Sequence, residues 1–136
     1  MGTLSGKVAV VIGGHSGFGE AIVQRLHREG AQIAIAARRI DVVNAAASAV
    51  GGKGYQCDIT NNDDIAALIQ GVEKDFGKID CLINNAMVHE AEALLNTSLE
   101  VWNRSIQITL TATFLCIRQV LPEMITRKKG NIINIG

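Results

Sequence analysis

The sequence predicts an α/β protein with a doubly wound parallel sheet whose two faces are both covered by helices. Short apolar, β-branched runs alternate with longer segments of helical periodicity along all 136 residues. The short runs are continuously apolar, as strands buried on both faces are. Glycines mark the junctions between the two kinds of segment. Together these observations favour repeated strand–helix units joined by right-handed crossovers.

Five strands are expected, and each follows from a local pattern. The first is the run Lys7 to Ile12, which a glycine turn joins to a helix from Phe18 to Arg28, ended by Gly30. The remaining strands are predicted at 32–37, 54–57, 81–84 and 131–135. Helices are predicted at 41–50, from the caps Thr60 and Asn61 to Phe76, and from Ser98 to Gly130. No linker or repeat divides the chain, so residues 1–136 form one domain.

The last helix carries a long apolar stripe, which we expect to face the sheet. Its members recur at helical spacing, and Trp102 among them is expected in the core: Trp102, Ile106, Leu110, Phe114, Ile117 and Leu121. Pro122 is expected to kink this helix because proline removes a backbone donor. Self-association through the long helix 99–127 is also expected, on the strength of a family resemblance rather than of this periodicity.

Composition excludes several classes of function. Hydrophobic residues make up 48% and the formal net charge is zero, which favours an ordered globular chain without a nucleic-acid surface. No signal peptide is evident, and no apolar run is expected to span a membrane. The three cysteines are interpreted as small buried hydrophobes. A cytoplasmic, reducing location is therefore predicted.

The first strand–helix turn predicts a dinucleotide site. Gly13, Gly17 and Gly19 stand in a G-x-x-x-G-x-G pattern, and glycine lets a phosphate approach the backbone closely. The helix that follows offers free N–H groups and a positive dipole end to a pyrophosphate. His15, Ser16 and Phe18 complete the candidate loop. The segment resembles the cofactor loop of the short-chain dehydrogenase/reductase family, although Ile12 replaces that family's usual threonine.

The end of the second strand predicts the choice of dinucleotide. A carboxylate there favours NAD, whereas an arginine accommodates the 2′-phosphate of NADP. The sequence has Arg38 and Arg39 at this point, with Asp41 already inside the next helix. NADP(H) is therefore preferred over NAD(H), with Arg38 as the main contact and Arg39 as a possible second. The alternative is that both arginines are solvated residues at a helix start.

Two further motifs carry the resemblance. Asp58 and Ile59 resemble the family's Asp-Val pair, which implies contacts with the adenine. Asn84-Asn85-Ala86-Met87 resembles the family's Asn-Asn-Ala-Gly signature. By that resemblance the asparagines pin neighbouring strand backbones and Ala86 approaches the cofactor ribose. Met87 replaces a glycine and would narrow the cofactor channel or line the substrate pocket.

The resemblance implies a Rossmann-like fold and hydride transfer between nicotinamide and a carbonyl or alcohol carbon of a small molecule. The family uses a Tyr, a Lys, a Ser and a helical Asn for this chemistry. Thr109 stands at the Asn position, and Tyr55, which has no Lys one helical turn later, is interpreted as structural. The matching pattern stops at Gly136, so we expect a truncated, incomplete domain whose fifth strand has an exposed apolar edge.

Other interpretations stay open. The chain could be a catalytically inactive nucleotide-binding or interaction module, or the sheet of an S-adenosylmethionine-dependent transferase. His15 could contact the 2′-phosphate or be an exposed turn residue. His89 and Glu90 could line a substrate pocket or belong to a solvated loop.

Overall fold

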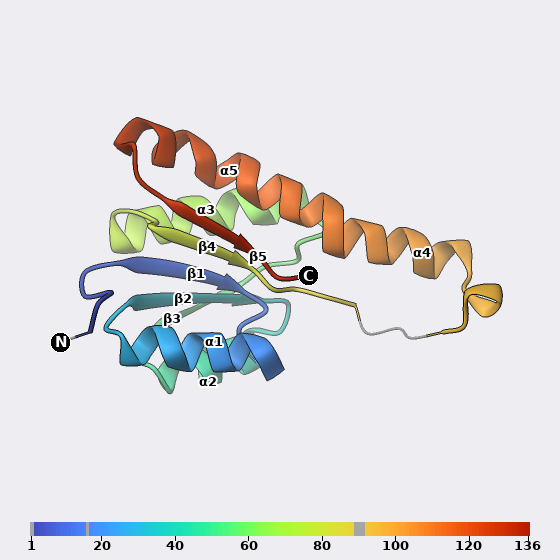
Figure 1. The fold of residues 1–136 in the computed structure, drawn as a ribbon, viewed down its shortest axis with the longest axis horizontal. Coiled ribbons are helices and arrows are strands. Elements are labelled where there is room, and N and C mark those ends of the chain that lie inside the picture. The colour runs from blue at the N-terminus through green and yellow to red at the C-terminus, as the bar shows by residue number, and fades with distance from the viewer. Residues whose placement is uncertain (1, 16, 89–91) are drawn as a thin grey trace.

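The computed structural model describes residues 2–15, 17–88 and 92–136, which form a single five-stranded parallel sheet between two helical layers (Figure 1). The strands lie in the order β3-β2-β1-β4-β5. Their bounds are β1 Val8–Ile12, β2 Gln32–Ala37, β3 Lys53–Gln56, β4 Cys81–Asn84 and β5 Asn131–Asn134. The order reverses at β1, because β2 and β3 lie on one side of it and β4 and β5 on the other. The expected five-stranded, doubly wound parallel sheet is confirmed.

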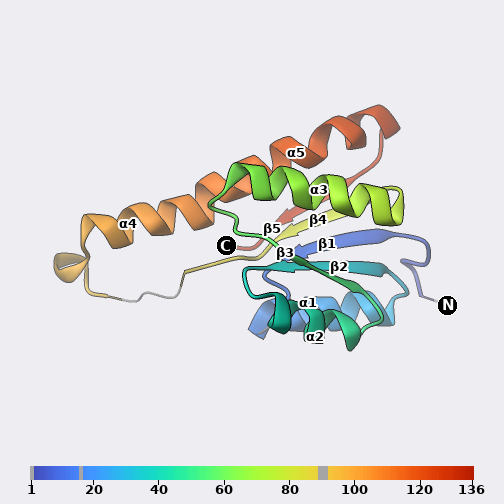
Figure 2. The same cartoon turned by 180° about the vertical axis from the view of Figure 1, so that it is seen from behind.

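The helices cover the two faces in pairs. Helices α1 (Gly17–Arg28) and α2 (Ile40–Ser48) lie on one face, and α3 (Asn62–Phe76) and α5 (Ala112–Arg127) on the other (Figures 1 and 2). A 3₁₀ turn, η1 (Leu94–Asn96), and helix α4 (Leu99–Ile106) follow β4, and α4 extends beyond the sheet. Two of the three predicted caps form, since Asn61 accepts from the Asp63 and Asp64 N–H groups and Ser98 accepts from that of Val101. The Thr60 hydroxyl donates to Asp58 instead.

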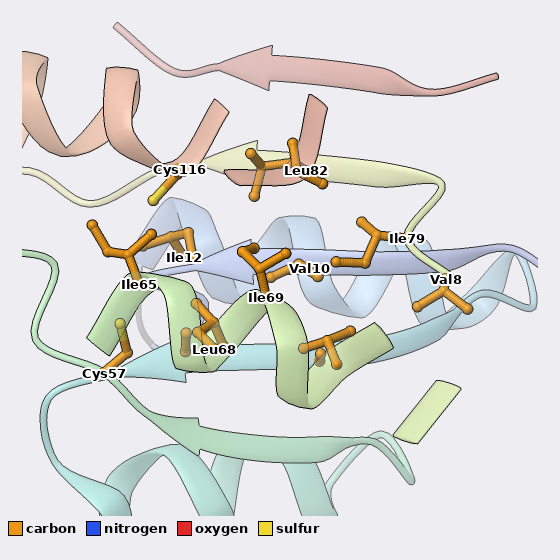
Figure 3. Close-up of a cluster of buried hydrophobic side chains, with 14 of the residues drawn as sticks. Val8, Val10, Ile12, Cys57, Ile65, Leu68, Ile69, Ile79, Leu82 and Cys116 are labelled. Carbon is orange, nitrogen blue, oxygen red and sulfur yellow. The ribbon is translucent and has the colours of Figure 1, made fainter. Parts of the chain in front are cut away.

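The core consists of two apolar layers separated by the sheet. All five residues of β1 are buried, as its continuous apolar run predicts. Alternate residues of β1 point to opposite layers: Val8, Val10 and Ile12 pack with α3 and α5 (Figure 3), whereas Val11 packs with α1 and α2. This rigid centre fixes the positions at which β1, β2 and β4 end, and therefore fixes the loops that follow them.

The cysteines fit the interpretation made from the sequence. Cys57 and Cys116 are buried in the layer beneath α3 and α5 (Figure 3), and Cys81 is half-buried. Burial raises the pKa of the Cys57 thiol to about 12 and that of Cys116 to about 11. Thiols with such pKa values stay protonated near neutral pH and are poor nucleophiles.

The long helix packs the other way round from the expectation. Trp102 is 54% exposed rather than in the core, and Leu110 and Phe114 of the same predicted stripe are exposed as well. The face of α5 that packs on the sheet is instead formed by smaller residues: Ala112, Cys116, Val120 and Met124. Helical periodicity predicts an apolar stripe, but this helix has two apolar stripes, and either could face the sheet. The stripe of smaller side chains faces it, which allows α5 to approach α3 and β4 closely.

The helix also contains an irregular turn that the sequence patterns do not predict. Residues Gln107–Thr111 form a π-helical turn, η2, between α4 and α5, whereas α5 continues through Pro122. It ends at Arg127 and is capped by Lys128, which adopts the left-handed conformation with φ 56°, rather than continuing to Gly130. A π turn carries one extra residue and is frequent at functional sites.

The expectation that no segment could span a membrane was too strong. By length and composition alone, the continuous helix Leu99–Arg127 is long and apolar enough to cross one. Part of that apolar content is explained by the face of α5 that packs against the sheet and α3. One such helix is weak evidence for a membrane location.

The edge strand β5 pairs with β4 alone among the described strands. Ile133 in it is 46% exposed, and both asparagines of the strand are exposed too. The exposed apolar edge expected from the sequence is therefore present.

The amino ends of the strands are held by one buried carboxylate. Asp80, which precedes β4, accepts from the backbone N–H of Val8 at 2.9 Å and forms ion pairs with Lys78 at 2.9 Å and Arg127 at 2.8 Å. Burial alone would raise the pKa of Asp80, but these hydrogen bonds outweigh it and lower the pKa to about 2. This network connects β1, β4 and the end of α5, and no local sequence pattern predicts it.

Candidate functional site

The glycine turn between β1 and α1 lies at the carboxyl end of the sheet, where its backbone is exposed to an incoming ligand. Gly13 has φ 76° and Gly17 has φ 57°, conformations that residues with a Cβ rarely adopt. A Cβ on Gly17 would meet nothing within 4 Å, so the space outside the turn is open. A Cβ on Gly19, by contrast, would overlap the carbonyl oxygen of Gly13. Glycine is therefore required here for conformation at Gly17 and for close packing at Gly19.

Asn85, just after β4, holds the glycine turn in place. Its Nδ2 donates to the carbonyl oxygen of Gly13 at 3.1 Å, and its backbone N–H donates to Ile12 at 3.2 Å. The role expected for the asparagines, to pin a neighbouring strand, is thus performed by Asn85. Asn84 instead donates to the side chain of Asn134 in β5 at 2.9 Å. The Oδ1 atom of Asn85 is buried and accepts no hydrogen bond from the described part of the chain.

The two arginines after β2 differ in their surroundings. Arg39 occupies the N-cap position of α2 without a capping side-chain hydrogen bond, and it pairs with Asp41 at 3.3 Å, with both side chains exposed. Arg38 lines an open cavity, and its guanidinium forms no hydrogen bond or ion pair within residues 2–15, 17–88 and 92–136. Its backbone carbonyl accepts from Gln56 Nε2 at 3.1 Å, which ties the ends of β2 and β3 together. Of the two arginines, only Arg38 lines the cavity of the candidate site.

The residues after β3 form a turn that borders the same cavity. Asp58 Oδ1 accepts from the backbone N–H and the hydroxyl of Thr60, at 2.9 and 2.7 Å. These hydrogen bonds lower the pKa of Asp58, so the side chain is an ionised turn cap. Ile59 is half-buried and packs on the layer beneath α3 and α5. Both residues stand next to the site, but one oxygen of Asp58 is already committed to the turn.

The cavity lies between the carboxyl ends of β2 and β3 and the first turns of α4. Its volume is about 690 Å³, within the range of small-molecule sites. The strand ends contribute Arg38, Asp58 and Thr60. The opposite wall, from α4 and the π turn, consists of Leu99, Glu100, Asn103, Arg104, Gln107 and Ile108. Gln107 Nε2 donates to the carbonyl oxygen of Thr60 at 3.3 Å and joins the two walls.

The α4 wall is the part of the site that the sequence analysis missed. Asn103, Arg104 and Gln107 are ordinary polar positions of an amphipathic helix, and no motif distinguishes them. A partial signal did exist, because polar residues alternate with the apolar stripe immediately before Thr109. That signal could not show that α4 extends over the ends of β2 and β3.

The other candidate residues occupy the rim. His15 and Phe18 are exposed beside the glycine turn, Ala86 is half-buried and Met87 is exposed. A Cβ on Gly13 would lie 3.3 Å from Cα of Ala86, so the two loops are in contact. Ser16, His89 and Glu90 lie outside the described residues. The structure thus brings together the glycine turn and the loop after β4, with Arg38 at the end of β2.

The candidate acid–base residues Thr109 and Tyr55 are not among the described residues that line the cavity. Thr109 is exposed within the π turn, and its carbonyl oxygen accepts from the hydroxyl of Thr113 at 2.9 Å. Tyr55 donates to Asp75 at 2.6 Å, and burial together with Asp75 raises its pKa far above the usual range. Tyr55 is therefore structural, as predicted.

A parallel sheet, a glycine turn at a helix start where the strand order reverses, and a cavity at the carboxyl ends of the neighbouring strands are typical of an α/β nucleotide-binding protein. The model of the short-chain dehydrogenase family matches residues 7–136. The chain belongs to this family, whose members use nicotinamide cofactors.

Individual relatives agree with the family assignment. A 2,5-dichloro-2,5-cyclohexadiene-1,4-diol dehydrogenase of Sphingobium indicum is 39% identical over 98% of this chain and 55% of its own length. The glycine betaine reductase of Emericella nidulans is 34% identical over 99% of this chain and 11% of its own. The crystal structure of a metagenomic short-chain oxidoreductase in complex with NADP has a TM-score of 0.89 and 37% identity, over 98% of this chain and 63% of that one.

The chain therefore spans about half the length of the dehydrogenase from Sphingobium that it matches. What is shared is the portion that contains the glycine turn, the ends of β2 and β3 and the loop after β4.

Proposed function

We propose that this chain is the NADP(H)-binding part of an oxidoreductase that transfers hydride between nicotinamide and a carbonyl or alcohol carbon of a small molecule. The observation that carries the proposal is the end of β2, where Arg38 lines an open cavity without a hydrogen-bonding or ion-pair partner among the described residues. An arginine at this point accommodates a 2′-phosphate, whereas a carboxylate would select NAD. The NADP in the related metagenomic structure supports the same choice.

The proposed site assigns each described residue a part in holding the dinucleotide. The glycine turn and the N-terminus of α1 bind the pyrophosphate through backbone N–H groups. Arg38 binds the 2′-phosphate in a charge-assisted way. Asp58 and Ile59 border the adenine, and Ala86 and Met87 lie on the side of the nicotinamide ribose. The open space outside Gly17 fits this assignment, because a phosphate needs close access to the backbone there.

When bound, the nicotinamide supplies hydride chemistry, and the residues of this chain position it. We assign no acid–base residue to these 136 residues, since Tyr55 is held by Asp75 and Thr109 is exposed within the π turn. The substrate and the proton transfer belong to the activity of the whole protein. Because this chain spans about half the length of the dehydrogenase from Sphingobium, that activity stays a proposal. The cytoplasmic location and the lack of nucleic-acid partners also stay predictions.

The alternative is a nucleotide-binding or interaction module without activity. Met87 in place of the family glycine and Thr109 in place of the family asparagine favour it. Both interpretations include cofactor binding, so turnover with a carbonyl substrate separates them, whereas cofactor titration tests what they share.

The first experiment is a titration of the purified chain with NADPH and with NADH, followed by energy transfer from Trp102 to the nicotinamide. We expect NADPH to bind more tightly than NADH. Arg38→Ala should weaken NADPH binding roughly ten- to a hundredfold, as the loss of one charge-assisted hydrogen bond predicts, and leave NADH unchanged. Arg39→Ala is the matched control, because Arg39 pairs with Asp41. A folded chain that binds neither dinucleotide would contradict the proposal.

We also propose that a second copy of the chain covers the exposed stripe of the long helix. A continuous row of large apolar side chains is unusual on a monomer surface. The exposed residues of this row are Leu99, Trp102, Ile106, Leu110, Phe114, Leu121 and Ile125. A single helix face of this kind suits a two-fold interface, in which the same patch meets itself.

Sedimentation of the chain across a concentration series tests this proposal. Phe114→Glu should shift a dimer to monomer, whereas Thr126→Glu, on the same helix but off the stripe, should not. A monomer at all concentrations would contradict the proposed two-fold interface.

A further inference from the structure

The edge strand β3 contributes a side chain to the end of its neighbour β2. Gln56, the last residue of β3, donates from Nε2 to the carbonyl oxygen of Arg38 at 3.1 Å. The paired residues of the two strands end with Ala37 and Gln56, and the N–H of Cys57 donates to the carbonyl oxygen of Ala37 at 2.9 Å. The Gln56 amide therefore extends the link between the two strand ends by one residue, to Arg38.

The turn from β2 into α2 lacks the contact that usually fixes a helix start. Arg39 occupies the N-cap position of α2 without a capping side-chain hydrogen bond, and its guanidinium pairs with the exposed Asp41. An N-cap side chain normally holds the entry into a helix by accepting from its first N–H groups. Here the side-chain contact on the turn comes from the neighbouring strand, so Gln56 holds the backbone from which the side chain of Arg38 projects.

The position of that backbone determines where the guanidinium of Arg38 can reach. Arg38 lines the cavity together with Asp58 and Thr60 of the segment after β3. Hydrogen bonds from Thr60 lower the pKa of Asp58, and the charge of Arg38 lowers it further, so the guanidinium lies within electrostatic range of this segment. Holding a long side chain in one place costs conformational entropy. A fixed carbonyl at Arg38 reduces the space that the guanidinium explores.

Positive charge in the cavity does not by itself select a phosphate. The described lining contains two carboxylates, Asp58 and Glu100, and two guanidinium groups, Arg38 and Arg104. Because these formal charges balance, selection depends on where the guanidinium at the end of β2 is held. A glutamine suits this task, since its Nε2 donates to a carbonyl without adding charge beside the site.

We infer that Gln56 is a positioning residue of the proposed cofactor site, whose amide holds the Arg38 backbone so that the guanidinium stays within reach of the 2′-phosphate. This inference rests on the proposed NADP(H) site and adds the edge strand β3 to the elements that determine its selectivity. Gln56 is not among the described residues that line the cavity, so it acts through Arg38.

The experiment compares the full chain with Gln56→Met, Gln56→Thr and the control Gln70→Met. Methionine is about as long as glutamine but has no donor, and threonine favours a strand but is too short to reach the Arg38 carbonyl. Gln70 is an exposed glutamine of α3 outside the described lining of the cavity. Each protein is titrated with NADPH and NADH, and then with adenosine 2′,5′-bisphosphate and AMP, which isolate the adenosine end of the site. Circular dichroism and a melting curve establish that each variant is folded.

We expect both Gln56 variants to weaken NADPH and adenosine 2′,5′-bisphosphate roughly fivefold, as the loss of one neutral hydrogen bond predicts, and to leave NADH and AMP within about twofold. Gln70→Met should change none of the four affinities. In an Arg38→Ala background, Gln56→Met should have no further effect on the ligands with a 2′-phosphate, because the guanidinium that it positions is gone.

An equal loss for ligands with and without the 2′-phosphate would overturn the inference, as would unchanged NADPH binding or a loss of folding in both Gln56 variants. A Gln56→Met effect that persists in full in the Arg38→Ala background would overturn it too. If Arg38→Ala weakens NADPH while Gln56→Met does not, this inference fails and the proposed function stands. If the full chain binds neither dinucleotide, the proposed function fails with it.

Discussion

The two ends of the parallel sheet use similar polar residues in opposite ways. At the amino ends, Asp80 is buried and saturated by Lys78, Arg127 and the backbone of Val8. At the carboxyl ends, Arg38 lines a cavity without such a partner, and one buried oxygen of Asn85 accepts no hydrogen bond from the described residues. Both ends are reached by the same strands, β1 and β4.

The difference shows how a sheet separates stability from binding. Charged side chains that pair with one another inside the protein hold the strands together, but their hydrogen-bonding groups are not available to a ligand. Charges left open at the other end add little to stability, and their donors are available to a phosphate. Substitutions at the two ends should therefore affect different measurements.

The largest expected effect is on stability, at the amino ends. Asp80→Asn leaves Arg127 without its nearest partner in a half-buried position and should lower the free energy of unfolding by about 3 kcal/mol. Urea unfolding followed by circular dichroism measures this change. Asp75→Asn, which disrupts the more exposed contacts with Lys53 and Tyr55, is the control and should cost clearly less. Equal losses would mean that the amino-end network has no special role.

The next effect separates two glycines at the carboxyl ends. Gly19→Ala forces a Cβ against the Gly13 carbonyl and should cost about 2 kcal/mol and displace the turn. The Cβ of Gly17→Ala would enter open space. This variant should lower the free energy of unfolding only by the strain of its positive φ, about 1 kcal/mol. Thermal melting gives the stabilities, and NADPH titration should show weaker binding for Gly19→Ala. A larger loss of stability for Gly17→Ala would contradict the packing argument.

An effect comparable in size to that of Gly19→Ala is the contribution of Asp80 to acid stability. Its pKa in the folded chain, about 2, lies below the value of about 3.9 expected when unfolded. A lowered pKa stabilises the fold above the unfolded value, and that stabilisation, roughly 2 kcal/mol, is lost as the pH falls from about 4 through 2. The free energy of unfolding, measured between pH 2 and 6, should therefore change more steeply with pH for the natural chain than for Asp80→Asn. Parallel pH profiles for the two proteins would refute this assignment.

Much of the fold follows from local sequence patterns. The strand Gln32–Ala37 was predicted to the residue, because a β-branched run lies between a C-capping glycine and two arginines. The caps Asn61 and Ser98 were predicted because their side chains satisfy free N–H groups at a helix start. These features depend on neighbours within a few residues, and such neighbours are visible in a sequence.

The errors arise where the structure depends on packing between two segments that lie far apart in the sequence. The period of the long helix could not show whether the stripe with Trp102 or the one with Cys116 would face the sheet, since both are apolar. Asp80 depends on Arg127, 47 residues later, and no pattern links them. In the candidate site, the glycine turn and Arg38 were identified from motifs, whereas Arg104 was not, because only the packing of α4 brings it to the cavity.

The π turn at Gln107–Thr111 sets the rotational phase between the two halves of the long helix. One residue of an α-helix corresponds to a rotation of about 100°. The extra residue therefore lets α5 present its small side chains to the sheet while α4 presents Arg104 and Gln107 to the strand ends. Deleting one residue there would restore a regular helix and rotate one half against the other. The chain would then keep either the packing of α5 on the sheet or the cavity wall formed by α4, but not both. The extra residue of the π turn is what allows both to form.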